Sequence, residues 1–285
     1  MSRIAYVNGR YRQLREACVS IEDRGYQFAD GVYEVCEVWG GRIVDMPRHM
    51  ARLQRSLSEI RIAMPMPLAA LSAILHELVA RNRVHYGLVY LQVTRGVARR
   101  DHVFPAASVK PSVVATARSL NFEKNQAAAA RGIAVATVPE NRWPRVDIKT
   151  VALLPNVLAR QSAREQGAYE AWYVDADGFV TEGSASNAWI LTHDGTVVTR
   201  SADRGILSGI TRAVLTDVLS ALQIRLEERP FTVAEAHGAA EAFVTAATQL
   251  VMPVVAIDGK PIGGGAPGPV TRRLREEYHR FCQFS

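Results

Sequence analysis

The chain has 285 residues, 48% of them hydrophobic, which is enough for one large domain or two medium ones, each with its own core. Three scattered cysteines exclude a disulfide framework, and no apolar run approaches the roughly 18 residues of a membrane span. The formal charge of +6 is spread along the chain without a basic run, which favours a solvated surface and anionic ligands over nucleic acid.

The first 118 residues carry signals for both strands and helices. Asn8-Gly9 predicts a hairpin within Ile4–Tyr11, and a second hairpin is expected within Gly31–Val44. Apolar residues at helical spacing follow Pro47 and predict an amphipathic helix. A further helix and two strands are expected at Leu68–Asn82, Leu88–Arg95 and Ser112–Ala117. This half therefore has an α+β pattern, with antiparallel strands and two helices.

A polar, alanine-rich stretch without strand periodicity follows residue 118. We therefore expect a small N-terminal α+β domain at 1–118, a linker at 119–130 and a larger C-terminal domain at 131–285. The elements expected in the larger domain are strands at Ile133–Val138, Ala171–Val174, Ala188–Leu191 and Ala242–Thr245, helices at Leu153–Glu165 and Gly209–Leu222, a hairpin at Asp258-Gly259, and a helix from Val270.

Two possible ligand motifs carry no function. Gly263, Gly265 and Gly268 match a dinucleotide-binding pattern, but they lie near the C-terminus and outside any strand–helix unit, so we expect a surface loop. Six histidines lack the paired spacing of metal ligands, and no metal is expected: His49, His76, His85, His193, His237 and His279.

Lysine is rare in this chain, and only four positions could supply lysine chemistry: Lys110, Lys124, Lys149 and Lys260. A lysine that attacks an aldehyde must lose its proton, which requires a positioned and partly desolvated amine. Apolar residues flank Lys149 just before a predicted helix, whereas the other three lie in loops or turns. Lys149 is thus the best catalytic candidate, although a lysine extending from a sheet edge would look the same.

Two later segments could bind an anionic ring compound. In Thr181–Asn187, small residues surround Glu182, so a flat ring could approach the backbone, and a carboxylate there could keep a pyridine nitrogen protonated. Gly209 with Thr211 at a helix start would present free N–H groups to a phosphate. Without Lys149, a strand-end turn with a solvated glutamate would be the preferred interpretation of the first segment, and an ordinary helix cap explains the second about as well.

Together and in this order, these segments resemble the class IV (fold-type IV) pyridoxal 5′-phosphate (PLP) transaminases. Further matching segments are Asp23–Phe28, Asp30–Glu34, Val93–Gly96, Asp147–Lys149, Thr181–Ser184, Gly209–Arg212 and Asp258–Lys260, so the resemblance covers nearly the whole chain. It implies a fold of two α/β domains with PLP at their interface.

The resemblance also implies roles for individual residues. Lys149 would be the Schiff-base lysine and proton carrier, and Glu182 the partner of the pyridine nitrogen. The other cofactor-binding positions would be Arg52, Ser184, Leu207, Ile210, Thr211, Ala247 and Thr248. Ala247 stands where a phosphate-contacting threonine is expected, so one hydroxyl contact is lost or moved to Thr248.

Within this family, the D-amino-acid branch is the most similar. Its substrate carboxylate is bound by a tyrosine, an arginine and a histidine, which correspond to Tyr33, Arg100 and His102. A shift by one residue would place Arg99 in the site instead of Arg100, and a solvated basic loop is the structural alternative. In the family the 95–102 loop reaches the neighbouring active site, which implies a homodimer.

The resemblance thus implies ping-pong transfer of the amino group from a D-amino acid, of the D-alanine or D-glutamate type, to 2-oxoglutarate or pyruvate. The alternative within this fold is an L-branched-chain or (R)-amine transaminase. A nucleic-acid-binding protein is the alternative from another class. No apolar secretory segment is visible at the N-terminus, so a cytoplasmic location is expected, without membrane or nucleic-acid partners.

Overall fold

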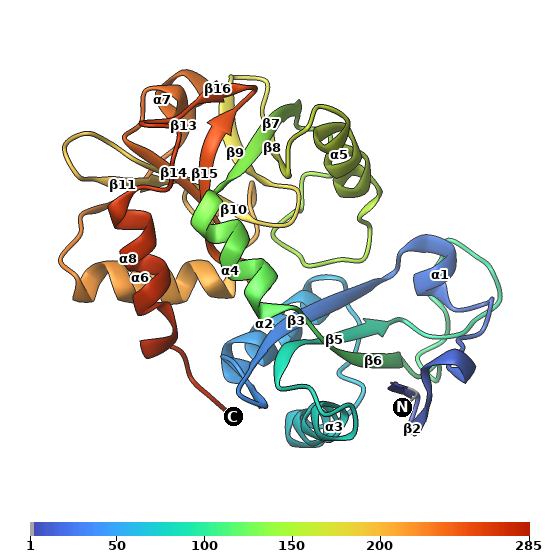
Figure 1. Ribbon diagram of the computed structural model, residues 1–285. Helices are drawn as coiled ribbons and strands as arrows, with labels where there is room; N and C mark the ends of the chain where they lie inside the picture. Colours follow the sequence, from blue (N-terminus) through green and yellow to red (C-terminus); the bar gives the residue numbers. More distant parts are fainter. Residues whose placement is uncertain (1–2) are drawn as a thin grey trace. The chain divides into compact units, whose positions relative to one another are not determined.

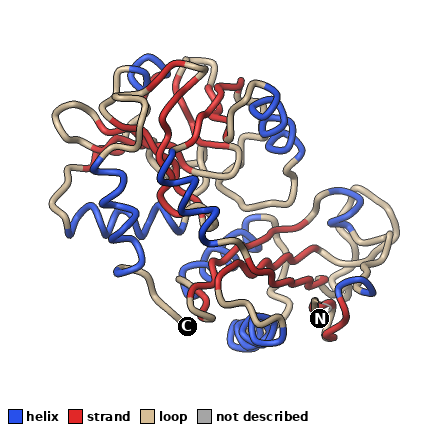
Figure 2. The backbone as a smooth tube through the Cα atoms, viewed as in Figure 1, coloured by secondary structure: helices blue, strands red, loops and turns tan. Residues whose placement is uncertain are grey.

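The computed structural model describes residues 3–285, which divide into two compact units. Among the described residues, unit 1 comprises 3–122, 148–152 and 283–285, and unit 2 comprises 123–147 and 153–282. Figure 1 shows the elements of each unit, and Figure 2 shows their strands and helices by colour. The short segment 148–152, which contains Lys149, therefore folds with unit 1 although the chain on both sides belongs to unit 2.

Unit 1 is built on a six-stranded antiparallel sheet, in the order β2-β1-β6-β5-β3-β4. Its strands are β1 (Ile4–Val7), β2 (Arg10–Gln13), β3 (Gly31–Trp39), β4 (Arg42–Ile43), β5 (Tyr86–Thr94) and β6 (Ser112–Ser119). Its helical elements are η1 (Leu14–Glu16), α1 (Arg24–Phe28), α2 (Met46–Glu59) and α3 (Leu68–Arg81). The two predicted hairpins and the two longer helices are confirmed.

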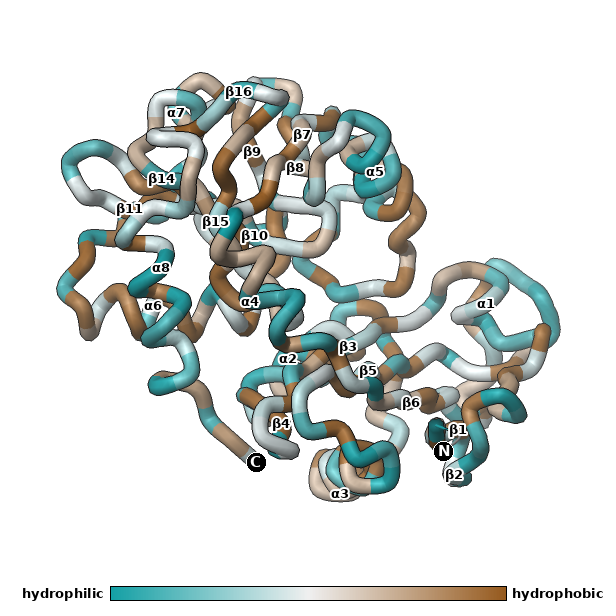
Figure 3. Tube along the Cα trace, in the orientation of Figure 1, coloured by the Kyte–Doolittle hydropathy of each residue, from teal (hydrophilic) through white to brown (hydrophobic). Residues whose placement is uncertain are grey.

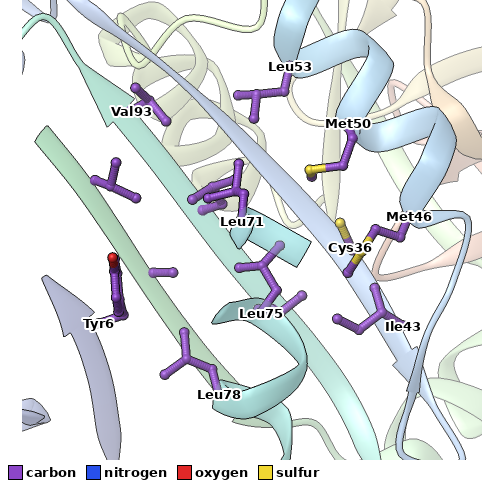
Figure 4. Packing of buried hydrophobic residues seen from close by; sticks show 14 of the residues in the cluster. Tyr6, Cys36, Ile43, Met46, Met50, Leu53, Leu71, Leu75, Leu78 and Val93 are labelled. Atoms are coloured by element: carbon purple, nitrogen blue, oxygen red, sulfur yellow. The ribbon is translucent and has the colours of Figure 1, made fainter. Parts of the chain in front are cut away.

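The core of unit 1 lies between this sheet and its two longer helices. Leu53 from α2 and Leu71, Leu75 and Leu78 from α3 are fully buried against strand residues such as Val93, as Figure 4 shows. These helix positions recur at intervals of three or four residues, so each helix presents one apolar face to the sheet. The helical periodicity visible in the sequence is therefore the pattern that forms this core.

Segment 148–152 occupies the open edge of β3. Strand β4 pairs only with Val38 and Trp39, which leaves the beginning of β3 without a neighbour on that side. There the Tyr33 N–H donates to the Lys149 carbonyl at 3.0 Å, and the Val151 N–H donates to the Gly31 carbonyl at 3.0 Å. Lys149 is consequently fixed by backbone hydrogen bonds to a strand, although it lies outside regular secondary structure.

Unit 2 contains a ten-stranded mixed sheet in the order β12-β11-β10-β14-β15-β7-β8-β9-β13, with β16 paired to β15. Its strands are β7 (Ile133–Pro139), β8 (Glu170–Val174), β9 (Phe179–Gly183), β10 (Asn187–Leu191), β11 (Val197–Thr199), β12 (Leu226–Glu228), β13 (Phe231–Thr232), β14 (Glu241–Ala246), β15 (Leu250–Ile257) and β16 (Lys260–Pro261). Hydrophobic residues gather along β7, β9 and β15 (Figure 3).

Helices cover this sheet at α4 (Phe122–Arg131), α5 (Leu154–Glu165), α6 (Ile210–Ala221), α7 (Val233–His237) and α8 (Pro269–Glu277), and η2 (Tyr278–Arg280) follows. Val214 and Leu215 of α6 and Leu274 of α8 share one buried cluster with Trp189 and Phe243. Residues 122–131, most of which lie within the predicted linker, form α4; this helix was not expected because it contains few large apolar residues.

The remaining expected features of unit 2 are also observed. The predicted helices correspond to α5, α6 and α8, and the glycine-rich match at 263–268 lies in a mostly exposed turn before α8.

No helix among the described residues has the length and apolar character needed to cross a bilayer. Within the same residues, no group of three His, Cys, Asp or Glu side chains is arranged to hold a metal ion.

Candidate active site

The predicted site residues fall into two sets, one in each unit. Lys149 is half-buried in unit 1, and its Nζ lies 4.2 Å from the centroid of the Tyr33 ring. Tyr33 is itself positioned by β3, and its ring lies 5.7 Å from that of Tyr90. The amine of this half-buried side chain thus has an aromatic neighbour, unlike a fully solvated surface lysine.

Arg52 is held by a buried carboxylate of unit 1. Its Nε and Nη2 atoms donate to the two oxygens of Glu34 at 2.9 and 2.7 Å, and Glu34 is fully buried. His49 Nδ1 lies 2.7 Å from Glu34 Oε2. Burial would raise the pKa of Glu34, but the charge and hydrogen bonds of Arg52, with the His49 hydrogen bond, lower it to about 2. Glu34 is therefore ionised and fixes the plane of the guanidinium.

Arg100 and His102 are exposed, and both contact the same aromatic ring. The Arg100 guanidinium lies 4.9 Å from the centroid of the Phe28 ring, and the His102 ring lies 5.4 Å from it. The structure thus brings together two of the three predicted carboxylate-binding residues. Tyr33, the third predicted carboxylate-binding residue, contacts Lys149 and Tyr90 and is not part of the cluster on Phe28.

In unit 2, the Glu182 carboxylate accepts hydrogen bonds from three different residues. It lies near the end of β9, is 5% exposed, and accepts from Arg142 Nη1 at 2.6 Å, Asn187 Nδ2 at 3.0 Å and the Leu207 N–H at 3.1 Å. Burial raises the pKa of Glu182, and the charge and hydrogen bond of Arg142 counteract only part of this effect. A further positive charge beside Glu182 would therefore be stabilising.

Arg142 is shared between two carboxylates. It also donates from Nε and Nη2 to Glu140 at 2.8 and 2.6 Å, and its guanidinium lies 4.2 Å from the centroid of the Tyr173 ring. Burial would raise the pKa of Glu140, but its hydrogen bonds and ion pair with Arg142 lower it. Because Glu140 takes up part of the arginine's charge, Glu182 is only partly neutralised.

The predicted phosphate-binding helix starts where expected. Gly209 is the N-cap of α6, no side chain caps this helix, and Ile210 and Thr211 form its first turn. A Cβ at Gly209 would clash with the Asn187 side-chain oxygen, so the close approach requires glycine. The uncapped N-terminus of a 12-residue helix is suited to an anion.

Three further predicted cofactor-binding positions lie in two turns of unit 2. Ser184 donates its hydroxyl to the buried carboxylate of Glu170, which also accepts from Ser186, so the Ser184 hydroxyl serves the turn itself. Ala247 and Thr248 lie in the turn between β14 and β15, where the Thr248 carbonyl accepts from Asn125 at 3.1 Å. The structure thereby assigns Ser184 a structural contact.

Three important residues received no role from the sequence. Asn187 lies within the segment that drew attention to Glu182, and it bridges Glu182 and the Leu207 carbonyl, at 3.0 and 2.9 Å. Arg142 donates a hydrogen bond to Glu182, and Glu170 accepts hydrogen bonds from Ser184. A buried carboxylate requires a cationic or amide partner. Arg142, which lies shortly before Lys149 in the sequence, was the available signal for the partner of Glu182.

A family model described as amino-transferase class IV matches residues 31–257. D-alanine aminotransferase of Staphylococcus haemolyticus is 38% identical over 278 residues, covering 98% of this chain and 97% of that protein. D-alanine aminotransferase of Bacillus licheniformis is 40% identical over 268 residues, covering 94% and 93%. The chain therefore belongs to the class IV aminotransferase family.

Solved structures agree with this assignment. The branched-chain aminotransferase of Thermoproteus uzoniensis with norvaline has a TM-score of 0.87 at 25% identity, covering 100% of this chain and 99% of that one. The branched-chain amino acid aminotransferase from Escherichia coli has a TM-score of 0.87 at 21% identity, covering 98% and 94%, and shows the same fold. The chain is an aminotransferase with the fold-type IV, α+β architecture, as predicted.

Proposed function

We propose that this aminotransferase uses PLP to move the amino group of a D-amino acid, of the D-alanine or D-glutamate type, to 2-oxoglutarate or pyruvate in a ping-pong reaction. The observation that carries the proposal is the 38% identity to a D-alanine aminotransferase over 98% of the chain. The pairing of Arg100 and His102 on Phe28 supports it, because an arginine and a histidine side by side suit a substrate carboxylate.

The residues present fit PLP. A buried carboxylate with an incompletely neutralised charge, an uncapped helix N-terminus and a lysine amine over an aromatic ring match its pyridine nitrogen, phosphate and aldehyde. When bound, PLP supplies an aldehyde that condenses with amines and a ring that accepts the electrons released from the Cα–H bond. Lys149 would hold the cofactor and then carry the proton from the substrate Cα.

Glu182 would maintain the proton on the pyridine nitrogen. Its ionised form gains a positive partner there, which offsets the burial that raises its pKa. Arg142, Asn187 and the Leu207 N–H hold its oxygens in place, so the carboxylate is oriented before the ring arrives.

The phosphate would contact the first turn of α6, with Ile210 and Thr211, and would also use Arg52 and Thr248. Ala247 offers no hydroxyl, so the phosphate has one contact fewer than the family pattern provides. A neutral hydrogen bond is worth about 0.5–1.5 kcal/mol, which weakens the binding of PLP without abolishing it.

The substrate carboxylate would be bound by Tyr33, Arg100 and His102, with the 95–102 loop contributed to the active site of the neighbouring subunit. A homodimer is consistent with apolar side chains exposed on α5, where Leu154, Val157 and Leu158 are 69%, 60% and 58% exposed. An apolar helix face of this kind is typical of a protein–protein interface.

The second candidate function is an L-branched-chain or (R)-amine transaminase. The similarity to a branched-chain aminotransferase structure favours the L-branched-chain activity over the (R)-amine activity. The fold alone does not decide the hand of the substrate. An amino-donor screen with both enantiomers of alanine, glutamate and valine, together with (R)-1-phenylethylamine, separates the candidates.

We expect turnover with D-alanine or D-glutamate and little with L-valine. In Arg100→Ala, we expect the KM for the D-amino acid to rise by at least about tenfold, because a charge-assisted hydrogen bond contributes about 1.5–3 kcal/mol. Arg99→Ala is the matched control and leaves this KM nearly unchanged. Preferred turnover of L-valine would contradict the proposed hand of the substrate.

A further inference from the structure

The loop between β5 and β6 carries Arg100 and His102, and it is fastened at its base. Gly96 has a φ of +105°, and a Cβ there would clash with the Lys110 carbonyl oxygen. The two ends of the loop therefore meet closely. Between them, residues 99–104 are all exposed and form neither helix nor strand, so anything that fixes their shape must lie outside regular secondary structure.

Arg24, the first residue of α1, donates hydrogen bonds to the backbone of this loop. Its side chain is 4% exposed, and its Nη1 donates to the carbonyls of Asp101 at 2.5 Å and Val103 at 3.4 Å. These two carbonyls flank His102. The Arg24 backbone N–H also donates to the Gly96 carbonyl at 2.9 Å, so one residue contacts the loop at its base and on both sides of His102.

Asp30 holds Arg24 in this position. Its Oδ2 accepts from Arg24 Nε at 2.8 Å and from Arg95 Nε at 2.7 Å, while its Oδ1 accepts from Arg95 Nη2 at 2.9 Å. Burial would raise the pKa of Asp30, but the hydrogen bonds and charges of Arg95 and Arg24 outweigh it and lower the pKa. The carboxylate is therefore ionised at neutral pH and locks both guanidinium groups.

Phe28, the last residue of α1, provides a platform for the loop's side chains. Its ring centroid lies 4.8 Å from the Arg24 guanidinium, 4.9 Å from that of Arg100, and 5.4 Å from the His102 ring. Two of the predicted carboxylate-binding side chains thus rest on one ring, beside the arginine that binds the loop's carbonyls.

We propose that Arg24 and Phe28 are positioning residues that hold Arg100 and His102 ready for the substrate carboxylate. The proposal rests on the proposed function, and it selects Arg100 over Arg99 because Arg100 is the arginine that shares the Phe28 ring with His102. The segment 23–30, which the sequence matched to the family without a role, thereby acquires one. A preorganised arginine loses less rotamer freedom on binding, so the effect falls on substrate affinity more than on the chemical step.

The test compares Phe28→Leu and Arg24→Met in the full-length holoenzyme with Arg81→Met. Arg81 is a matched control, because its guanidinium lies 4.1 Å from the centroid of the Tyr11 ring and pairs with Glu77, away from the loop. We expect Phe28→Leu and Arg24→Met to raise the KM for D-alanine by about tenfold, with kcat within about threefold. Arg81→Met changes neither.

A second readout does not depend on the substrate. Hydrogen exchange of the Ala98 and Val103 amides, which donate to the Glu22 carbonyl and to Asp101 Oδ1, should accelerate several-fold in cofactor-free Arg24→Met, and exchange in β1–β2 should not. Arg24→Lys, which retains a donor for the two carbonyls, should restore part of the protection. If Arg24→Met does not fold, Phe28→Leu, at a half-buried position, decides the question by its KM.

The possible failures are distinguishable. If Arg100→Ala raises the KM for D-alanine but Phe28→Leu and Arg24→Met do not, the positioning role is wrong and the proposed function stands. If Arg100→Ala leaves that KM unchanged while loop exchange accelerates in Arg24→Met, the D-amino-acid site is wrong and the fastening of the loop stands. Unchanged exchange and unchanged KM in both variants overturn the proposal.

Discussion

Glu34 in unit 1 and Glu182 in unit 2 are both buried and both face an arginine, yet their pKa values are shifted in opposite directions. Glu34 receives two hydrogen bonds from Arg52 and one contact from His49, which lower its pKa to about 2. Glu182 receives one hydrogen bond from Arg142, which also serves Glu140, and its pKa is raised by burial.

The difference shows how a buried carboxylate is used. The charge of Glu34 is neutralised within the protein, so it orients Arg52. The charge of Glu182 is incompletely neutralised, so a cation supplied by a ligand would be stabilised beside it. In the proposed function, Glu34 would therefore position a phosphate-binding arginine, whereas Glu182 would itself face the cofactor ring.

The largest effect on stability is expected for Glu34→Gln. Removing one partner of a buried ion pair costs about 3–5 kcal/mol, because the charge of Arg52 is left uncompensated. Urea unfolding of the cofactor-free protein measures this loss. Arg81→Met, which breaks the exposed Glu77 pair, is the control and should change stability by less than about 1 kcal/mol. A loss below about 1 kcal/mol in Glu34→Gln would remove the distinction between the two carboxylates.

The pH dependence of stability should separate the two carboxylates. Folding lowers the pKa of Glu34 from 4.5 to about 2, so the stability it adds is present above pH 4.5 and is lost as the pH falls toward 2. This shift corresponds to about 3 kcal/mol. Glu182 has the opposite sign, because a raised carboxyl pKa stabilises the fold at low pH and this contribution is lost as the pH rises through the folded-state value.

Unfolding curves of the cofactor-free protein between about pH 2.5 and 5 measure this difference. Glu34→Gln should lose much less stability than the parent over this range, whereas Glu182→Gln should lose at least as much. Equal acid sensitivity of the parent and Glu34→Gln would show that Glu34 is not held ionised in the fold.

Glu182→Gln should act on turnover and leave stability unchanged or slightly higher. A neutral amide cannot maintain the proton on the pyridine nitrogen, so we expect kcat to fall by about a hundredfold or more. Steady-state assays with D-alanine and urea unfolding of the same preparation provide the two readouts. Full turnover in this variant would mean that Glu182 does not serve the cofactor ring.

Local pattern recovered the main helices and strands, including the apolar faces of α2 and α3, because each needs only a few neighbouring positions. Glu34 and Arg52 are 18 residues apart, and Arg142 and Glu182 are 40 apart. Nothing in a single sequence gives the pairing of such distant charges. The contacts of Arg24 and Phe28 with the Arg100 loop could not be predicted for the same reason. The role expected for Lys149 came from the order in which the family-like segments follow one another, and not from its own neighbours.

The smallest effect is expected at Ala247. Ala247→Thr restores the hydroxyl of the family pattern, and one added hydrogen bond of about 0.5–1.5 kcal/mol should tighten PLP binding by roughly threefold to tenfold. Titration of the cofactor-free protein with PLP measures the dissociation constant. Ala247→Val is the matched control, since it adds similar volume without a hydroxyl. Equal affinity in the threonine and valine variants would exclude a phosphate contact at this position.

The most direct test of the proposed chemistry is to locate the covalent attachment of PLP. The holoenzyme is treated with borohydride, which makes a lysine–PLP linkage permanent, and its peptides are analysed by mass spectrometry. We predict the phosphopyridoxyl group on the peptide that contains Lys149, and its loss from this peptide in Lys149→Ala. Attachment to Lys110, Lys124 or Lys260, or no attachment in a preparation that turns over D-alanine, would contradict the assignment of Lys149.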